Sequence, residues 1–470
     1  MHVLLVEDRP SVIEIFQLAC EREGVRLSVA TSLSGAEAVL DKGRINADLA
    51  VCDLKIPTSH GGVDEEVAHG LSVLRRLQEE CPGVPVIVLS AFGTVDVVSD
   101  MLLGARQVDL YGDGSERPML RFWQKANIKG VIQAIGEANE QLRQIDQVEL
   151  YAPDLSDAYR RAIRLFARRR AGSVVEYRGL AGGRSGAQTG LVTVRSQGGA
   201  QTAHAVGKLT TVSRAVEEKE RYRNHIAGRL AAATYTDLSD EVMAGCGSSA
   251  GLFYSVADNF GRDIFSVLRE DEQAAGAVVR TVSEVFSPWL NGVPWSDRSW
   301  LDLRRNLIAD EDYEDVTRAY DVVAIHGERR VQTVWTSQHG DLHGANVLVD
   351  DSLRPVLIDY GRVGFGPSPL DAVTLELSAF MHPDSPFRHH DWPSAQDLSR
   401  WSDLEAYLAG CPYPTFVRAC REWALKVRVG QRDLYCTICA FSLRNLQYGD
   451  VDKEKVLALQ QYAAAQVNAS

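Results

Sequence analysis

Three short apolar runs near the start of the chain each end in polar side chains, and this pattern restricts the fold more than any other feature. The runs and the residues that end them are 2–6 before Glu7 and Asp8, 48–52 before Asp53, and 84–89 before Ser90. Segments with helical periodicity separate the runs. The first part of the chain, residues 1–145, is therefore predicted to be an α/β domain in which strands and helices alternate around a parallel sheet.

Parallel strands place their carboxyl ends along one edge of the sheet, so these polar groups are expected to converge. The oxygens of Glu7, Asp8 and Asp53 suit a hard cation such as Mg²⁺. Asp53 could then accept a phosphoryl group, with a hydrogen bond from Ser90 and an ion pair from Lys125. The alternatives are that the acids only cap helices and turns, or that the domain does not accept phosphate.

Over about residues 1–145 the chain resembles the receiver domain of response regulators. The resemblance implies a doubly wound, parallel, five-stranded sheet, with a histidine kinase or a small phosphodonor as partner. The residues it implies are the acidic pair Glu7 and Asp8, the phosphoacceptor Asp53, the Lys55 carbonyl as a further metal ligand, the switch residues Ser90 and Phe122, and the phosphate-pairing Lys125. The chain departs from the pattern at Ala126, where the family usually has proline, and has extra residues near 58–69 and 108–121.

A helical connector is predicted for residues 146–171. Its basic run, Arg160 to Arg170, has the periodicity of an amphipathic helix. We expect these arginines to form a solvated face; a surface for an anionic partner is the alternative. Since the connector is not rich in Gly and Ser, a stiff coupling is expected.

The segment 339–367, HGDLHGANVLVDDSLRPVLIDYGRVGFGP, carries a second set of polar groups. Asp341 and Asn346 share one loop, and a strand, a turn and a second strand then lead to Asp359. Phosphoryl transfer from ATP requires a carboxylate that orients the attacking hydroxyl and oxygen ligands that hold Mg²⁺. This segment is therefore predicted to carry the centre of an ATP-dependent phosphotransferase.

Upstream of that segment, residues 174–209 are predicted to form an antiparallel sheet whose third strand carries Lys208. A helix is predicted for residues 213–230, where Glu217 or Glu220 could pair with Lys208 and direct it at phosphates; Glu220 is favoured. The turn before the sheet's second strand is rich in glycine and contains Gly182, Gly183 and Gly186.

Across about residues 172–465 the chain resembles the aminoglycoside phosphotransferase and choline kinase branch of the kinase-like superfamily, and more narrowly the "ternary complex associated" kinase-like domains. The resemblance implies a bilobal α+β domain that binds ATP and Mg²⁺. The residues it implies are the base Asp341, the metal ligands Asn346 and Asp359, the phosphate-binding Lys208, and the loop glycines Gly182, Gly183 and Gly186.

Two departures bear on the acceptor. Gly340 stands where protein kinases have arginine, and no long segment lies between Asp359 and a motif like the APE of protein kinases, so a peptide platform is not expected. Residues 372–470 are predicted to be helical and to form the acceptor pocket, as the resemblance implies. Asp371 is interpreted either as a brace of the catalytic loop or as a helix N-cap.

The predicted domains are a receiver, a helical connector, an N-lobe and a C-lobe, at residues 1–145, 146–171, 172–258 and 259–470. We hypothesise a two-component signalling protein whose phosphorylated receiver regulates a phosphotransferase acting on a hydroxyl of a small molecule or another acceptor. The alternative is a non-catalytic, nucleotide-binding adaptor.

Composition limits the partners. A net charge of -13 argues against nucleic acid as the main ligand, and no apolar stretch approaches the roughly 20 residues of a membrane helix. Eight scattered cysteines suit a reducing compartment, and Cys436 and Cys439 are interpreted as buried thiols. A cytoplasmic protein is expected, and a homodimer is compatible with the sequence.

Overall fold

The structure is a computed structural model that describes residues 1–470 except 42–46, 91–105, 153, 181–185, 258 and 470. The chain forms two compact units. The N-terminal unit comprises Met1–Val216 and Leu238–Ser255, and the C-terminal unit comprises Glu217–Asp237 and Val256–Ser470. The receiver and the first part of the kinase-like region therefore belong to one unit. No helix among the described residues is long and apolar enough to cross a membrane.

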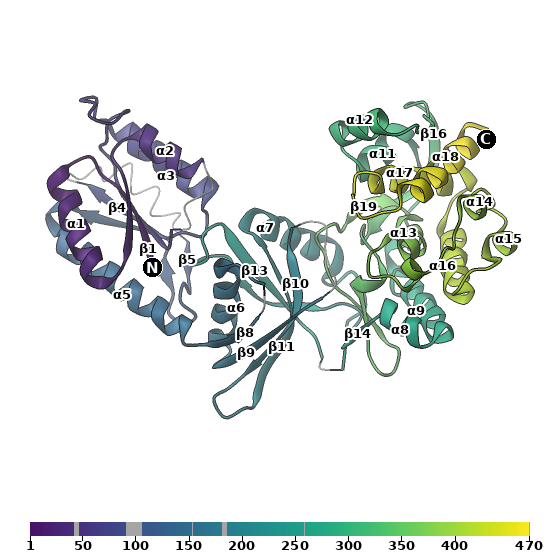
Figure 1. Ribbon diagram of the computed structural model, residues 1–470, viewed down its shortest axis with the longest axis horizontal. Helices are drawn as coiled ribbons and strands as arrows, with labels where there is room; N and C mark the ends of the chain where they lie inside the picture. The colour runs from purple at the N-terminus through teal and green to yellow at the C-terminus, as the bar shows by residue number, and fades with distance from the viewer. Residues whose placement is uncertain (42–46, 91–105, 153, 181–185, 258, 470) are drawn as a thin grey trace. The chain divides into compact units, whose positions relative to one another are not determined.

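The first domain has the predicted parallel sheet, with strand order β2-β1-β3-β4-β7. Every residue of the three central strands is buried, because helices cover both faces of the sheet (Figure 1). The strands are β1 (His2–Val6), β2 (Arg26–Ala30), β3 (Leu49–Asp53), β4 (Val86–Ser90) and β7 (Leu120–Gln124). The described helices are α1 (Pro10–Glu23), α2 (Leu33–Leu40), α3 (Val67–Glu80) and α5 (Ile128–Asp146).

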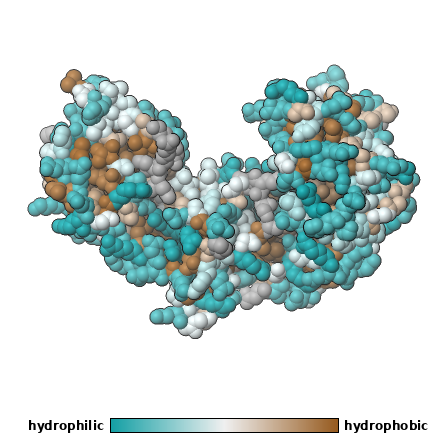
Figure 2. Space-filling view, viewed as in Figure 1, coloured by the Kyte–Doolittle hydropathy of each residue, from teal (hydrophilic) through white to brown (hydrophobic). Residues whose placement is uncertain are grey.

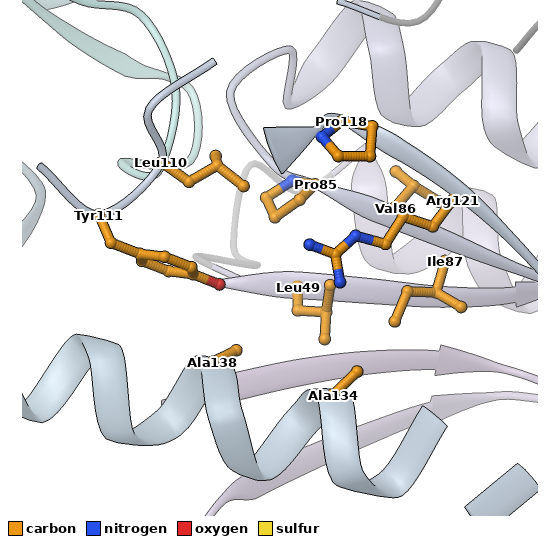
Figure 3. A pocket seen from close by; sticks show the side chains of 10 residues that line it. All are labelled: Leu49, Pro85, Val86, Ile87, Leu110, Tyr111, Pro118, Arg121, Ala134 and Ala138. Atoms are coloured by element: carbon orange, nitrogen blue, oxygen red, sulfur yellow. The ribbon is translucent and has the colours of Figure 1, made fainter. Parts of the chain in front are cut away.

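A short hairpin, β5 (Gln107–Val108) and β6 (Arg117–Pro118), precedes strand β7 and accounts for the extra residues near 108–121. A small pocket lies between the hairpin, the sheet and helix α5 (Figure 3). Leu110 and Tyr111 line it from the hairpin segment, and Arg121 extends into it from β7.

The N-terminal unit also contains a six-stranded sheet with the order β12-β13-β11-β10-β9-β8. The predicted antiparallel pairing of its central strands is confirmed, and Lys208 lies on β11. The predicted connector is not wholly helical, because β8 pairs in parallel with β9 and extends the sheet. The strands are β8 (Glu149–Tyr151), β9 (Val174–Gly179), β10 (Gln188–Arg195), β11 (Gln201–Thr211), β12 (Asp237–Val242) and β13 (Ser249–Ser255).

Helix α6 (Asp157–Arg169) joins the receiver to this sheet through one apolar core. Phe166 stacks on Phe253 of β13 with ring centroids 4.0 Å apart. Leu142 and Ile145, from the receiver helix α5, belong to the same buried cluster. The receiver helix and the sheet therefore share one continuous core, and the stiffness of their coupling stays a prediction.

The prediction of a solvated arginine face on α6 is wrong. Arg161 forms an ion pair with Asp48 at the start of receiver strand β3. Arg168 donates to the carbonyl of Tyr111 at 3.1 Å, and Arg169 donates to the carbonyl of Asp109 at 2.7 Å. The arginines therefore hold the receiver to the rest of the unit, since a guanidinium can bond several acceptors at once.

The C-terminal unit is mainly helical, as predicted for residues 372–470. In the face drawn in Figure 2, hydrophilic residues cover most of its surface. Trp392, Trp401, Phe416 and Trp423 are all buried, as expected of core residues.

Two small sheets and a series of helices build this unit. The strands are β14 (Arg262–Asp263), β15 (Trp295–Ser299), β16 (Arg330–Gln338), β17 (Val347–Val349), β18 (Pro355–Leu357) and β19 (Gly364–Pro367). The helices are α8 (Ile264–Glu270), α9 (Glu272–Val285), α10 (Ser287–Leu290), α11 (Trp300–Leu307), α12 (Asp310–Ala319), α13 (Leu370–Met381), α14 (Ala395–Leu398), α15 (Leu404–Leu408), α16 (Pro414–Val427), α17 (Gln431–Asn445) and α18 (Lys453–Ala469). Helix α7 (Val212–Arg221) contains the boundary between the units and ends before the predicted 230, in a π-helical turn over Tyr222–Ile226.

A buried ion pair joins helices α13 and α16. Arg421 donates to both carboxylate oxygens of Glu376, at 2.7 and 2.9 Å, and its guanidinium lies 3.3 Å from the ring centroid of Trp401. Both charged side chains are almost fully excluded from solvent. Because neither charge can be solvated by water in place of its partner, separating the two side chains would be costly.

Replacing Arg421 with alanine is expected to destabilise the fold by about 3–5 kcal/mol, because Glu376 would be left buried without its partner. Chemical unfolding followed by tryptophan fluorescence measures the loss. The matched control is Arg418→Ala on the same helix, which removes an exposed pair with Glu405 and should leave the unfolding midpoint nearly unchanged. Equal effects of the two substitutions would contradict the prediction.

Candidate phosphoryl-transfer sites

The receiver's acidic residues converge at the carboxyl edge of its sheet. Ligand oxygens of Glu7, Asp8 and Asp53 all lie within 4.8 Å of one another. The Nζ atom of Lys125 lies 2.6 Å from Oδ2 of Asp53 and 2.9 Å from Oε2 of Glu7. Lys125 directly follows β7, the strand next to β4, and this position places its ammonium group beside the carboxylates.

Asp53 and Glu7 are buried, and Asp8 is half-buried. Burial raises the pKa of Asp53 and of Glu7 above their usual values, and the hydrogen bond and charge of Lys125 offset part of both shifts. One oxygen of Asp8, Oδ1, is buried without a hydrogen-bond partner. Three carboxylates with an unsatisfied buried oxygen fit a Mg²⁺ ion, which would neutralise their charge.

The structure also describes the other predicted receiver residues. Ser90 is buried at the end of β4, opposite Gln124 in the neighbouring strand. Phe122 lies on β7, partly buried against the core. The backbone N–H of Lys55 donates to Oδ1 of Asp53 at 3.3 Å.

In the C-terminal unit, the loop that carries Asp341 forms hydrogen bonds with Asp371, at the start of helix α13. One carboxylate oxygen of Asp371 accepts the N–H of His339 at 2.7 Å, and the other accepts the N–H of Gly340 at 2.9 Å. Asp371 is thus the brace of the loop, as one of the two interpretations expected. His339 is also buried, and its ring bonds to the carbonyl of Ile358 at 3.0 Å, so it has a structural role.

Backbone bonds link the loop to the strand that ends at Asp359. The predicted hairpin is present as β17 and β18, and the N–H of Ile358 donates to the carbonyl of Asn346 at 3.1 Å. The side-chain amide of Asn346 donates to the carbonyl of Asp341 at 2.9 Å. The fold therefore brings Asp341, Asn346 and the segment of Asp359 together.

Asp359 itself has a φ of 65°, a left-handed conformation that is uncommon for residues other than glycine. Its Oδ1 accepts the N–H of Gly361 at 3.3 Å. Such strain occurs at functional sites when the surrounding structure holds the residue in place. The amide oxygen of Asn346 and the carboxylate of Asp359 are hard ligands of the kind that Mg²⁺ prefers.

The geometry explains why Gly340 precedes Asp341. Gly340 has a φ of 75°, and a Cβ atom there would lie 2.5 Å from the carbonyl oxygen of Arg362. Any side chain at this position would force the two segments of the site apart.

The sequence interpretation missed Arg444 on helix α17. Its guanidinium donates to Oδ1 of Asp341 at 2.8 Å and to the carbonyl of Gly340 at 2.9 Å. Burial acts to raise the pKa of Asp341, but the charges of Arg444, His343 and Arg362 outweigh it and hold the pKa below its usual range. Arg444 is about 100 residues away in the chain, and no local sequence pattern connects it with Asp341.

The remaining predicted residues lie on the N-terminal unit or on helix α7. Lys208 is buried on β11, and Gly186 is exposed with a φ of 72°. Gly182 and Gly183 lie outside the described residues. Both Glu217 and the favoured Glu220 are exposed, whereas Glu218 is 3% exposed, so the glutamate that α7 buries is one the sequence interpretation did not consider.

Comparisons with known proteins agree with this organisation. Residues 3–108 match the family model of the response regulator receiver domain, and residues 228–407 match that of the phosphotransferase enzyme family. The chain thus combines a receiver domain of two-component response regulators with a kinase-like phosphotransferase-family domain.

The curated relatives match in the receiver part. The transcriptional regulatory protein GlrR of Escherichia coli K12 is 35% identical over 94 residues, which are 20% of this chain and 19% of GlrR. CseB of Streptomyces avermitilis, also a transcriptional regulatory protein, is 36% identical over 141 residues, which are 29% of this chain and 52% of CseB. The chain therefore spans between about a fifth and a half of the length of these relatives.

Similar solved structures include two receiver domains. A CheY-like response regulator receiver domain protein from Methanospirillum hungatei has 18% identity and a TM-score of 0.23, over 30% of this chain and 97% of that chain. The receiver domain of the sensor histidine kinase PA1611 from Pseudomonas aeruginosa, solved with a magnesium ion in its active-site cleft, has 18% identity and a TM-score of 0.20, over 29% and 97% of the two chains.

The substitution Asp8→Asn is expected to weaken Mg²⁺ binding to the receiver about tenfold or more, because it replaces a charged ligand beside two others. Isothermal titration calorimetry with Mg²⁺ measures the affinity. Asp64→Asn is the control, since Asp64 is an exposed acid that bonds to Thr58 outside the cluster. Equal losses in both variants would argue against a metal site at Asp8.

Proposed function

We propose that this chain is a signalling protein in which phosphorylation of Asp53 regulates an ATP-dependent phosphotransferase acting on a hydroxyl group. The observation that carries the enzymatic part is the linked set of Asp341, Asn346 and Asp359, held by the bonds of Asp371 and Ile358. Phosphoryl transfer depends mainly on positioning and charge stabilisation, and this arrangement supplies fixed oxygen groups.

In this mechanism Asn346 and Asp359 would hold Mg²⁺, which supplies charge neutralisation at the phosphates of ATP. Lys208 would pair with the phosphates, and Asp341 would orient the acceptor hydroxyl and accept its proton. The acceptor oxygen forms the new bond to the γ-phosphorus. The bond from that phosphorus to the bridging oxygen breaks, and ADP leaves with the electron pair.

The acceptor is proposed to be a small molecule rather than a peptide chain. The segment after Asp359 enters strand β19, which pairs with β16, and helix α13 then begins at Leu370. This segment is occupied by intramolecular pairing, so it does not offer an extended platform for a peptide. The buried helices of the C-terminal unit are the candidate walls of the acceptor pocket.

Helix α6 provides a physical basis for the regulatory part. Asp48 directly precedes strand β3, and Asp53 is the last residue of this strand. Asp48 forms an ion pair with Arg161 of α6. The same helix packs against β13, which pairs with the β11 strand that carries Lys208. A change at Asp53 can therefore reach the Lys208 strand through packed elements of one unit.

One observation favours a second candidate, a nucleotide-binding adaptor without catalysis. Oδ1 of Asp341 already bonds to Arg444. An aspartate in such an ion pair is a weaker base, so the chain could bind nucleotide without transferring phosphate.

Phosphotransferase activity is tested by incubating the protein with γ-labelled ATP and Mg²⁺, alone and with a small-molecule fraction of a cell extract. We expect a labelled product, and a loss of about 10²-fold or more in its rate for Asp341→Ala, which removes the group that orients the acceptor. ATP binding should persist in the variant. If ATP binds and no labelled product depends on Asp341, the adaptor function is the correct one.

Regulation is tested with acetyl phosphate as the phosphodonor. Label should enter the wild-type receiver and be absent in Asp53→Asn, and phosphorylation should change ATP turnover at least about twofold. Arg161→Met should still accept label at Asp53 but lose this change in turnover, because the ion pair with Asp48 is removed. Arg214→Met, an exposed arginine of helix α7, is the matched control. An undiminished response in Arg161→Met would exclude this route.

A further inference from the structure

Helix α17 brings a charged side chain to the centre of the proposed transfer site. Arg444, near the end of this helix, is 6% exposed, and it donates hydrogen bonds to Asp341 and to the preceding carbonyl of Gly340. Every residue of α17 from Asp433 to Asn445 is buried. The guanidinium therefore approaches the catalytic loop from a rigid element of the core.

The two oxygens of Asp341 have different surroundings. Oδ1 accepts the hydrogen bond from Arg444 at 2.8 Å. Oδ2 accepts no hydrogen bond from the described residues, and it lies 4.0 Å from Nε of the half-exposed Arg362. Because Asp341 remains about one-third exposed, Oδ2 is the oxygen available to a hydroxyl group from outside.

The chemistry of arginine suits this position. Its planar guanidinium presents several donors in a fixed arrangement, so it can bond a carboxylate and a neighbouring carbonyl at the same time. The ammonium group of a lysine would keep the charge but would not hold both acceptors in one plane. Asp371 bonds the same loop through the N–H groups of His339 and Gly340. The loop is thus held by a carboxylate from α13 and a guanidinium from α17.

We propose that Arg444 is a positioning residue for the transfer reaction. It fixes Oδ1 of Asp341 and the carbonyl of Gly340, so that Oδ2 is directed to the acceptor hydroxyl. This inference rests on the proposed phosphotransferase function. It also gives the C-terminal helices a part in orienting the catalytic carboxylate, in addition to any part in binding the acceptor.

The kinetic test uses ATP·Mg²⁺ with water as the acceptor, in the full-length protein. Arg444→Met should lower kcat about 10²-fold and leave KM for ATP within about twofold, because Arg444 bonds to the loop of Asp341 and not to the proposed phosphate or metal ligands. Arg444→Lys should recover part of the loss by keeping the charge. Arg432→Met, on the same helix and bonded to the carbonyl of Arg330, is the matched control and should retain wild-type turnover.

A second measurement is independent of activity. Thermal unfolding of Asp341→Asn, Arg444→Met and the double variant forms a double-mutant cycle. Each single change already removes the ion pair, so the fall in Tm of the double variant should be clearly smaller than the sum of the two single falls. Binding of a fluorescent ATP analogue should be the same in all of these proteins.

The outcomes separate the two claims. Three results would each overturn the positioning role and leave the proposed function standing. They are an unchanged turnover in Arg444→Met, falls in Tm that are additive in the double variant, and a loss of nucleotide binding that parallels the loss of turnover. A wild-type protein that binds the ATP analogue but shows no turnover would overturn the proposed function, and the positioning role would fall with it. Coupled falls in Tm in that case would show that the ion pair serves stability alone.

Discussion

Charged groups that leave water are costly unless they meet a partner, and this constraint governs how the chain joins its distant segments. Several buried or half-buried ion pairs of the structure lie where strands, helices and loops from different regions meet. The principal pairs are Lys125 with Asp53 and Glu7, Arg161 with Asp48, Arg421 with Glu376, and Arg444 with Asp341. In each pair one charge would lose its partner if the other segment moved away. The pairs therefore specify how these segments are arranged as well as stabilise that arrangement.

The pairs of the N-terminal unit lie at the two ends of one buried strand. Strand β3 begins after Asp48, which binds the basic helix α6, and ends at Asp53, which binds Lys125. A phosphoryl group on Asp53 would add negative charge next to Lys125 and change one end of a rigid element. The other end is tied to a helix that shares its core with the six-stranded sheet. A receiver and part of a kinase-like domain are thereby mechanically continuous within one unit.

Functional residues that belong to a local sequence pattern could be recognised without a structure. Asp53 ends a buried strand, and Asp341, Asn346 and Asp359 lie in one short segment of loop, strand, turn and strand, so neighbouring residues in sequence remain neighbours in space. Glu218 could not be selected by spacing, because Glu217 and Glu220 fit the predicted helix equally well and only packing shows which side of α7 is buried. The arginines of α6 looked like a solvated face because acceptors such as the carbonyls of Tyr111 and Asp109 have no sequence signature.

The sequence by itself determined the class of each domain, since strand periodicity, strand-end acids and the catalytic segment are local features that survive in any packing. Only the tertiary structure decided what each charge contacts. Arg444 reaches Asp341 because helix α17 is buried beside the catalytic loop, and Gly340 is required because the carbonyl of Arg362 fills the space of a side chain. These relations depend on distances between segments far apart in the chain, and periodicity and spacing carry no information about such distances.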